Sequence, residues 1–178
     1  LWEAKGRWLV IVDAPDSAAS NTDGGSRTRL TDAIDEVLDG ASPRGVDVLY
    51  SHAHQDHIGA TRRVVDYLRA THPSRRVAIW GTDEADEMVK RSTTGRAVRV
   101  TRRVPRSGAS LRLGRGLRVD LHVVGGHTAT DLAIHIPPSG RLSGVLHHVD
   151  VVFPGWAPPY TLAITEDVGR YRDVHGDL

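Results

Sequence analysis

Four side chains that can bind a metal ion follow an apolar segment within six residues of the chain. The segment from Val46 to Tyr50 is predicted to be a strand, and it runs directly into His52, His54, Asp56 and His57. In an extended backbone, residues two apart point to the same side, so the imidazoles of His52 and His54 can converge on one ion. Asp56 and His57 fall on the turn into a helix, where the chain reverses. The sequence therefore predicts a preorganised metal site at a strand-to-helix junction.

The available ligands narrow the class of metal. The chain has no cysteine, which excludes thiolate zinc sites, iron–sulfur clusters, cysteine nucleophiles and disulfides. Imidazole and carboxylate ligands suit Zn²⁺, and iron or manganese is also compatible with them. A histidine-rich surface turn is the alternative interpretation. The position directly after an apolar strand favours the metal site.

The size and charge of the chain point to a single globular domain. It has 178 residues, of which 39% are hydrophobic and 25% charged, and we expect one domain over residues 1–178. No apolar run approaches the roughly 18 residues that a membrane span needs. The net charge of +1 gives no strong attraction to nucleic acid or to anionic lipid. We expect a small-molecule substrate and no membrane partner, whereas the oligomeric state stays open.

The start of the sequence affects what can be predicted about the extent of the domain and its cellular compartment. It begins with Leu1 inside a segment that resembles a strand, so we expect the domain to be truncated at both ends. The sequence consequently leaves the cellular compartment open, with the cytoplasm as the working expectation.

The order of expected elements indicates a mixed α/β fold. Strands and helices alternate in the first half, and several strands follow in the second half, which predicts helices packed on sheets. The expected strands of the first half are Trp8 to Val12, Val46 to Tyr50 and Val77 to Trp80. The expected helices are Leu30 to Leu38, one that follows the histidine motif with Ile58, Val64, Val65 and Leu68 as its apolar stripe, and Asp83 to Arg91. The later strand-like segments are Ala97 to Val104, Leu117 to Val124, Leu132 to Ile136 and Gly144 to Val151.

The segment from His52 to His57 resembles the HxHxDH signature of the metallo-β-lactamase fold superfamily, and three further motifs follow in the order of that family. Asp13 ends the first strand and resembles the acidic residue that supports the metal site. Gly126-His127-Thr128 resembles the GH[ST] motif, and Asp150 resembles the bridging aspartate. The resemblance implies a four-layer αβ/βα sandwich with the metal site at one edge between the two sheets. Its second half would be incomplete in this chain.

The resemblance also implies a dinuclear ligand set, with one or two Zn²⁺ ions. The first metal would be held by His52, His54 and His127, and the second by Asp56 and His57. Asp150 would bridge the two metals, and Asp13 would support the site from behind. The family's final histidine ligand comes from a loop beyond the bridging aspartate. His175 is the only histidine after Asp150, and we predict that it is not this ligand because no apolar strand precedes it.

The function implied by these residues is that of a zinc-dependent hydrolase. A metal-bound hydroxide would attack an ester, lactone, thioester or amide bond, with the metal polarising the substrate oxygen. Asp56 would be the catalytic residue that orients the nucleophile and moves its proton. Three alternatives stay open: a phosphodiesterase or nuclease, a mononuclear iron oxidoreductase of the same superfamily, and a fragment without activity.

Three further features lie outside the predicted ligand set. Residues 88–119 contain Lys90 and nine arginines but no carboxylate. This strip would bind a phosphate-bearing substrate if it faced the metal site, although a solvated sheet face is the default interpretation and nucleic acid is disfavoured. Trp156 lies in a loop rich in proline and glycine, where it would either line the pocket or serve as a hydrophobic anchor. His148 lies on the same face of its expected strand as Asp150, and we expect a structural histidine there.

Overall fold

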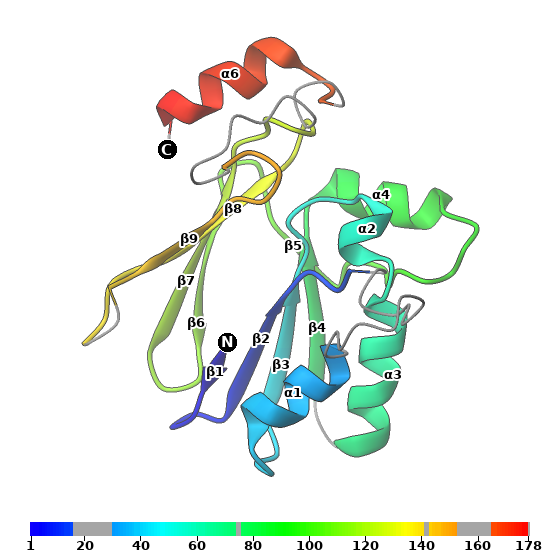
Figure 1. The fold of residues 1–178 in the computed structure, drawn as a ribbon, viewed down its shortest axis with the longest axis vertical. Helices are drawn as coiled ribbons and strands as arrows, with labels where there is room; N and C mark the ends of the chain where they lie inside the picture. The colour runs from blue at the N-terminus through cyan, green and yellow to red at the C-terminus, as the bar shows by residue number, and fades with distance from the viewer. Residues whose placement is uncertain (16–29, 74–75, 141–142, 153–164, 178) are drawn as a thin grey trace, which may run out of the picture.

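Two β-sheets face each other in the computed structural model, which describes residues 1–15, 30–73, 76–140, 143–152 and 165–177 (Figure 1). The first half of the chain forms one sheet with its helices, and the second half forms the other sheet. This is the mixed α/β architecture with two packed sheets that the sequence predicted.

The first sheet has the order β1-β2-β3-β4-β5 and is mainly parallel. Its strands β2, β3, β4 and β5 pair in parallel, and only β1 pairs in the antiparallel direction. Parallel strands bring their carboxyl ends to one edge of the sheet, where ligand sites of such sheets lie. The bounds of the strands are Trp2–Glu3 for β1, Trp8–Val12 for β2, Gly45–Leu49 for β3, Arg76–Gly81 for β4 and Arg102–Arg103 for β5.

Helices α1 (Leu30–Leu38) and α3 (Thr61–Thr71) cover the outer face of the first sheet (Figure 1). Their apolar residues recur at helical spacing and form one apolar face on each helix. This face packs against the strands because the contact removes apolar surface from water. Successive side chains of β2 point to opposite faces of the sheet, so Leu9 and Ile11 pack against the helices and Val10 packs on the other face. The core between helices and sheet includes Leu9, Ile11, Ile34, Leu38, Val46, Val48, Val64, Val65, Leu68 and Ile79.

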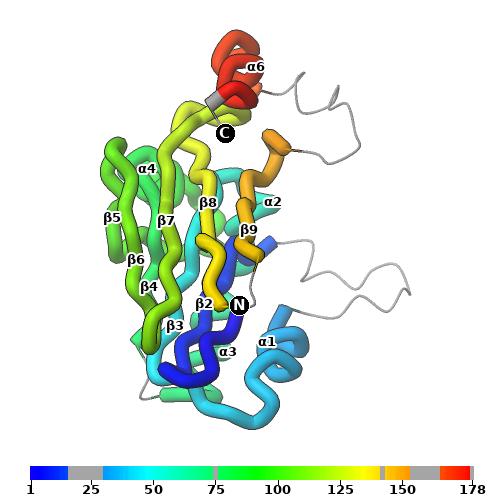
Figure 2. The backbone as a smooth tube through the Cα atoms, turned by 90° about the vertical axis from the view of Figure 1, so that its left-hand side faces the viewer, coloured from blue at the N-terminus to red at the C-terminus, as the bar shows by residue number. Residues whose placement is uncertain are grey.

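The second sheet is antiparallel, with the order β6-β7-β8-β9. Its inner face packs on the first sheet through a second core that includes Val10, Leu49, Val104, Leu111, Val119, Leu121, Leu132 and Ile134. Figure 2 views its outer face, which no helix of the described residues covers. Three of the four expected layers are therefore visible. The strands are β6 (Ala109–Leu113), β7 (Leu117–Val123), β8 (Leu132–Ile136) and β9 (Val145–His147).

Three further helices lie near the end of the sandwich where β3 and β4 finish (Figure 1). They are α2 (Gln55–Ile58), α4 (Asp83–Arg91) and α6 (Val168–Asp177). Helix α6 packs with Tyr171 and Val174 against Val151 in a small third core. Within the described part of the chain, no helix is long and apolar enough to cross a membrane.

The structure differs from the sequence prediction in the element after the histidine motif. One helix was expected there, and two short helices are found, α2 and α3, because the amide of Ala60 donates to the carbonyl oxygen of Ala14 (2.8 Å). That hydrogen bond replaces one that a continuous helix would make.

Two predicted strands are shorter than expected, and one strand was not predicted. Of the expected strand from Ala97 to Val104, only β5 is formed, since the amide of Val100 donates to the buried carboxylate of Asp86 (3.0 Å) rather than to a neighbouring strand. The expected strand from Gly144 to Val151 ends at His147, and Asp150 lies in a turn with a φ of 59°. Strand β6 escaped prediction because its five residues include only three apolar side chains.

Candidate metal centre

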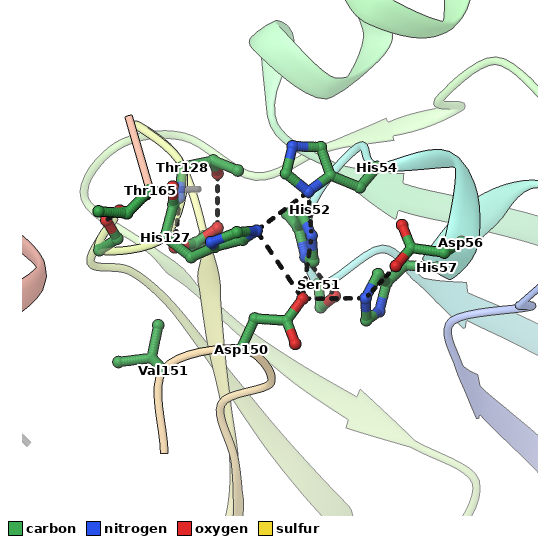
Figure 3. Close-up of polar contacts among 12 residues, drawn as sticks. Ser51, His52, His54, Asp56, His57, His127, Thr128, Asp150, Val151 and Thr165 are labelled. Carbon is green, nitrogen blue, oxygen red and sulfur yellow. Dashed lines mark hydrogen bonds and ion pairs between the residues drawn. The ribbon is translucent and has the colours of Figure 1, made fainter. Parts of the chain in front are cut away.

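The first sheet contributes its site residues from the carboxyl ends of β2 and β3 (Figure 3). Asp13 directly follows β2 and adopts a φ of 58°, a left-handed conformation that aspartate tolerates better than most residues. Ser51 and His52 follow β3, and His54 precedes the first turn of α2. Because β2 and β3 are parallel neighbours, these residues meet at one edge of the sheet.

The second sheet contributes two more residues from loops at the same end. His127 lies in the connection between β7 and β8, and Asp150 lies in the turn after β9. Both side chains point toward the histidines of the first sheet in Figure 3. The site therefore lies between the two sheets, at the edge where the sequence resemblance placed it.

Three imidazole nitrogens converge in a first cluster. The Nε2 atom of His52 lies 3.0 Å from Nδ1 of His54, and Nε2 of His127 lies 3.1 Å from the same Nδ1 atom. Nitrogens that share a tetrahedral zinc ion at about 2.1 Å stand roughly 3.4 Å apart, so the observed spacing is close to that of a ligand set. His52 and His127 are buried and His54 is half-buried.

A second cluster adjoins the first through Asp150. The Oδ2 atom of Asp150 lies 3.0 Å from Nε2 of His57 and 3.6 Å from Nε2 of His52. It also lies 3.9 Å from Nε2 of His127, so that one carboxylate oxygen faces both clusters. Asp56 is mostly exposed, and its Oδ2 atom lies 3.5 Å from Nε2 of His57. All six predicted ligand positions are thus gathered in one region.

Asp13 and Ser51 form a buried support behind these rings. Asp13 accepts hydrogen bonds from the Ser51 amide (2.8 Å) and the Ser51 hydroxyl (2.6 Å). The Ser51 oxygen lies 3.1 Å from Nδ1 of His52, and Oδ2 of Asp13 lies 3.2 Å from Nδ1 of His57. Each of these two rings therefore has its far nitrogen engaged, as metal-bound histidines usually do.

The electrostatics of the protein without an ion separate the histidines into two kinds. Burial, and then the neighbouring rings of His57 and His54, lower the pKa of His52 to about 3. Burial and then His127 also lower the pKa of His54. These two rings are consequently neutral at pH 7, and neutral imidazole is the form that binds metal. Burial likewise disfavours charge on His57, but hydrogen bonds to Asp13 and Asp150 outweigh it and raise its pKa to about 10.

The loop that carries His127 is held by residues that the sequence did not single out. Asp131 is buried and accepts from the Thr128 amide (2.9 Å) and the Thr128 hydroxyl. The Thr165 hydroxyl donates to the carbonyl oxygen of Gly126 (2.7 Å), and the Glu166 amide donates to that of His127 (3.1 Å). The spacing Thr-x-x-Asp was a usable signal for Asp131. For Thr165 and for Ser51 the sequence carried none.

Other candidate residues lie outside the two clusters. The ring nitrogens of His175 face backbone carbonyl oxygens of Tyr171 (2.8 Å) and Val151 (3.0 Å). His148 is buried, yet it belongs to neither group of ligand atoms found among the described residues. Trp156 falls outside the described residues.

Three arginines of the strip form ion pairs with acidic side chains of α4. Arg99 and Arg103 contact Asp86, and Arg106 contacts Glu84. These ion pairs favour the default interpretation of a solvated face over that of a phosphate site.

Solved structures with a similar overall fold identify the architecture of this chain. BJP-1, a subclass B3 metallo-β-lactamase of Bradyrhizobium japonicum, superimposes with a TM-score of 0.61 at 15% identity, over 99% of this chain and 64% of its own. FEZ-1, a metallo-β-lactamase from Legionella gormanii, gives 0.60 at 14% identity, over 98% of this chain and 66% of its own. This chain has the metallo-β-lactamase fold. No protein-family model matches the sequence, and no curated protein matches it.

The metallo-β-lactamase fold is present here in a chain that spans less than two thirds of the length of BJP-1 and FEZ-1. The BLEG-1 B3 metallo-β-lactamase has a TM-score of 0.57 at 18% identity, and 77% of its chain is covered. The fold implies a metal, and the donor set of this chain fits one. Within the described residues, His52, His54 and His127 form one group of ligand atoms within 4.8 Å of one another, and His52, His57 and Asp150 form another.

Proposed function

We propose that this chain is a zinc-dependent hydrolase that cleaves an amide or ester bond of a small molecule, with a β-lactam ring as the first substrate class to test. The observation that carries the proposal is the convergence of His52, His54 and His127 from two different sheets on one point. BJP-1 and FEZ-1, which share the fold, are metallo-β-lactamases, and this supports a cyclic amide as substrate. Lactones and thioesters are the further carbonyl substrates of this proposal.

The ligand set that we propose has two parts. His52, His54 and His127 would hold the first ion, and Asp56 and His57 would hold the second, with Asp150 between them. When bound, such ions lower the pKa of water and polarise a carbonyl oxygen, so that hydrolysis proceeds near neutral pH. The Oδ2 atom of Asp150 lies 3.0 Å from Nε2 of His57, 3.6 Å from that of His52 and 3.9 Å from that of His127, and this position between the two groups supports a dinuclear centre.

The protein's own residues would orient the reaction. The carboxylate of Asp56 is mostly exposed at the side of the clusters, where it can accept a proton from an attacking water molecule. Asp13 and Ser51 keep the rings of His57 and His52 in their orientations through the buried hydrogen bonds described above. The reacting groups are thereby positioned before substrate arrives, which is the main contribution that a rigid site makes to rate.

The experiment that tests this proposal combines metal analysis with a substrate panel. Purified protein loaded with zinc is assayed with a chromogenic cephalosporin, a lactone, a thioester and bis(p-nitrophenyl) phosphate. We expect stoichiometric zinc and hydrolysis of a carbonyl substrate. The variants His52→Ala and His54→Ala should lose both zinc and turnover, whereas His122→Ala, at an exposed position on the second sheet, should keep both.

Two outcomes would contradict the proposal. Turnover that survives in the His52→Ala variant would show that the cluster is not the site. Stoichiometric iron without zinc, or cleavage of the phosphodiester alone, would favour the iron oxidoreductase or the phosphodiesterase in its place.

A further inference from the structure

A second feature lies directly beside the metal centre and has no role in the function proposed above. The Nδ1 atom of His54 faces the Nε2 atoms of His52 and His127. Its other ring nitrogen, Nε2, points away from this first cluster in Figure 3. His54 also lines a separate cavity of about 230 Å³, together with residues of α4. One side chain therefore separates the proposed metal centre from a pocket.

The walls of this pocket are largely apolar. Its floor belongs to the core between helices and first sheet, and its rim is formed by α4 and by the residue that follows that helix. Met88 is 45% exposed at this rim, an uncommon position for a large apolar side chain. The apolar lining residues are Ala53, Ile58, Met88, Val89 and Ala97.

The size of the pocket suits a cyclic or short-chain hydrocarbon group. An apolar cavity of about 150 Å³ already binds benzene, so 230 Å³ accommodates an aromatic ring together with one linking group. Because the floor consists of buried core residues, the pocket is preformed. Binding therefore does not carry the entropic cost of ordering the pocket.

The His54 ring adds one directional polar contact. If Nδ1 offers its lone pair to an ion, the neutral ring carries its proton on Nε2. Metal-bound histidines usually donate this proton to a carboxylate, a backbone carbonyl or water. Among the described residues, no acceptor lies within hydrogen-bond distance of His54 Nε2, whereas His52 and His57 have theirs in Ser51 and Asp13. This N–H group is free for an acceptor inside the pocket.

We propose that this pocket binds an apolar side group of the substrate, such as an aryl-acetamido group, whose carbonyl oxygen accepts from His54 Nε2. The proposal rests on the function proposed above, since it assigns the His54 proton from metal binding through Nδ1. It identifies Met88 and Ser92 at the rim as residues that determine substrate specificity. A substrate held in this way would have its side group on one face of the His54 ring and its reacting bond on the other.

The test uses the fact that the chain contains a single methionine, Met88. In zinc-loaded protein labelled with ¹³C at the methionine methyl group, NMR shows one signal, which reports on the pocket without any need for turnover. We expect phenylacetamide to shift this signal saturably, with a dissociation constant in the millimolar range, and acetamide to leave it in place. Toluene, which has the ring but no acceptor, should bind more weakly.

Matched variants decide whether the ligand occupies the pocket. Ser92→Trp should fill the pocket from its exposed rim and abolish the shift, whereas Ser92→Ala should keep it. Glu87→Trp places the same side chain on α4 at an exposed position that does not line the pocket, and it should also keep the shift. Absence of saturable binding to the wild type, or equal binding to Ser92→Trp, would overturn the proposal.

The enzymatic assay separates this proposal from the function itself. With zinc bound, Ser92→Trp should lower kcat/KM for a substrate with a phenylacetyl side group about tenfold more than for an acetyl analogue, mainly through KM, whereas Glu87→Trp should lower neither. If the wild type hydrolyses neither substrate, the proposed function fails while the NMR titration still tests the pocket. If both are hydrolysed and Ser92→Trp affects them equally, the pocket is not the specificity site.

Discussion

At the scale of single residues, Asp13 is the side chain on which most of the histidine geometry depends. It adopts a left-handed backbone conformation and is buried, with its two carboxylate oxygens facing Ser51 and His57. A plain turn residue before Pro15 is the alternative interpretation of this aspartate. The turn explains the backbone conformation but not the inward direction of the carboxylate.

The substitution Asp13→Asn tests whether Asp13 acts as a turn residue or as a carboxylate that supports the ligand histidines. Asparagine tolerates the same backbone conformation, but its amide removes the charge and one acceptor from beside His57. Loss of a carboxylate that supports a ligand histidine typically weakens metal binding about 10- to 100-fold, and we expect that loss here. Zinc affinity is measured by competition with a chelating dye. Asp66→Asn on the exposed surface of α3 serves as the control, and an affinity of Asp13→Asn within twofold of wild type would leave Asp13 as a turn residue only.

At the scale of elements, the sequence predicted the features that depend on neighbouring residues in the chain. The strand before His52 and the turn after it lie within one short segment, so apolar pattern and ligand spacing could be interpreted together. The positions of His127 and Asp150 depend on the pairing of β7, β8 and β9, which a single sequence does not encode locally. For these two residues, only the resemblance to a known family led to the site.

The edges of the elements were harder to predict, because side chains compete there for backbone groups. Val100 gives its amide to Asp86, and Ala60 gives its amide to Ala14, so an expected strand and an expected helix are both interrupted. Such contacts join residues that are far apart in sequence, and the pattern of apolar residues does not predict them.

Helix α4 is tied to the segment that follows it through the buried carboxylate of Asp86. This carboxylate accepts from Arg99 (2.6 Å), Arg103 (3.1 Å) and the amide of Val100 (3.0 Å). The Arg99 hydrogen bonds, against the opposing effect of burial, lower the pKa of Asp86 from 3.8 to about 2. Because the pKa is lower in the folded state, the carboxylate stabilises the fold above pH 3.8, and this stabilisation is lost as pH falls through 2.

The variant Asp86→Asn should therefore have a free energy of unfolding about 2 kcal/mol lower than wild type at pH 7. The difference should shrink to about half by pH 3, because the wild-type carboxylate is then partly protonated in the unfolded chain. Urea unfolding followed by circular dichroism measures both values. Glu87→Gln on the same helix, with an exposed side chain, should show neither effect, and a difference that stays constant down to pH 3 would show that the carboxylate charge is not responsible.

At the scale of the whole molecule, the proposed metal centre is a cross-link between the two sheets. His52 and His54 belong to the edge of the first sheet, whereas His127 and Asp150 come from loops of the second. Direct hydrogen bonds also join the sheets at this edge, from the Leu132 amide to the carbonyl oxygen of Ser51 (2.8 Å) and between the hydroxyls of Thr82 and Thr130 (3.3 Å), and an ion would add to them. Zinc binding would consequently stabilise the packing of one sheet on the other, beyond any role in catalysis.

This arrangement predicts a large thermal effect of zinc. Because an ion held by ligands from both sheets binds only the folded protein, zinc at about 100 times its dissociation constant should stabilise the fold by about 2.7 kcal/mol. For a chain of this size that corresponds to a rise in Tm of roughly 5–10 °C, reversed by a chelator. His127→Ala removes the second sheet's imidazole while leaving His52 and His54 as a pair on the first sheet, so it should keep weak zinc binding but lose most of the rise. If His127→Ala kept the full rise in Tm, zinc would be binding to one sheet alone, and the two halves of the sandwich would be held together by their core without help from the ion.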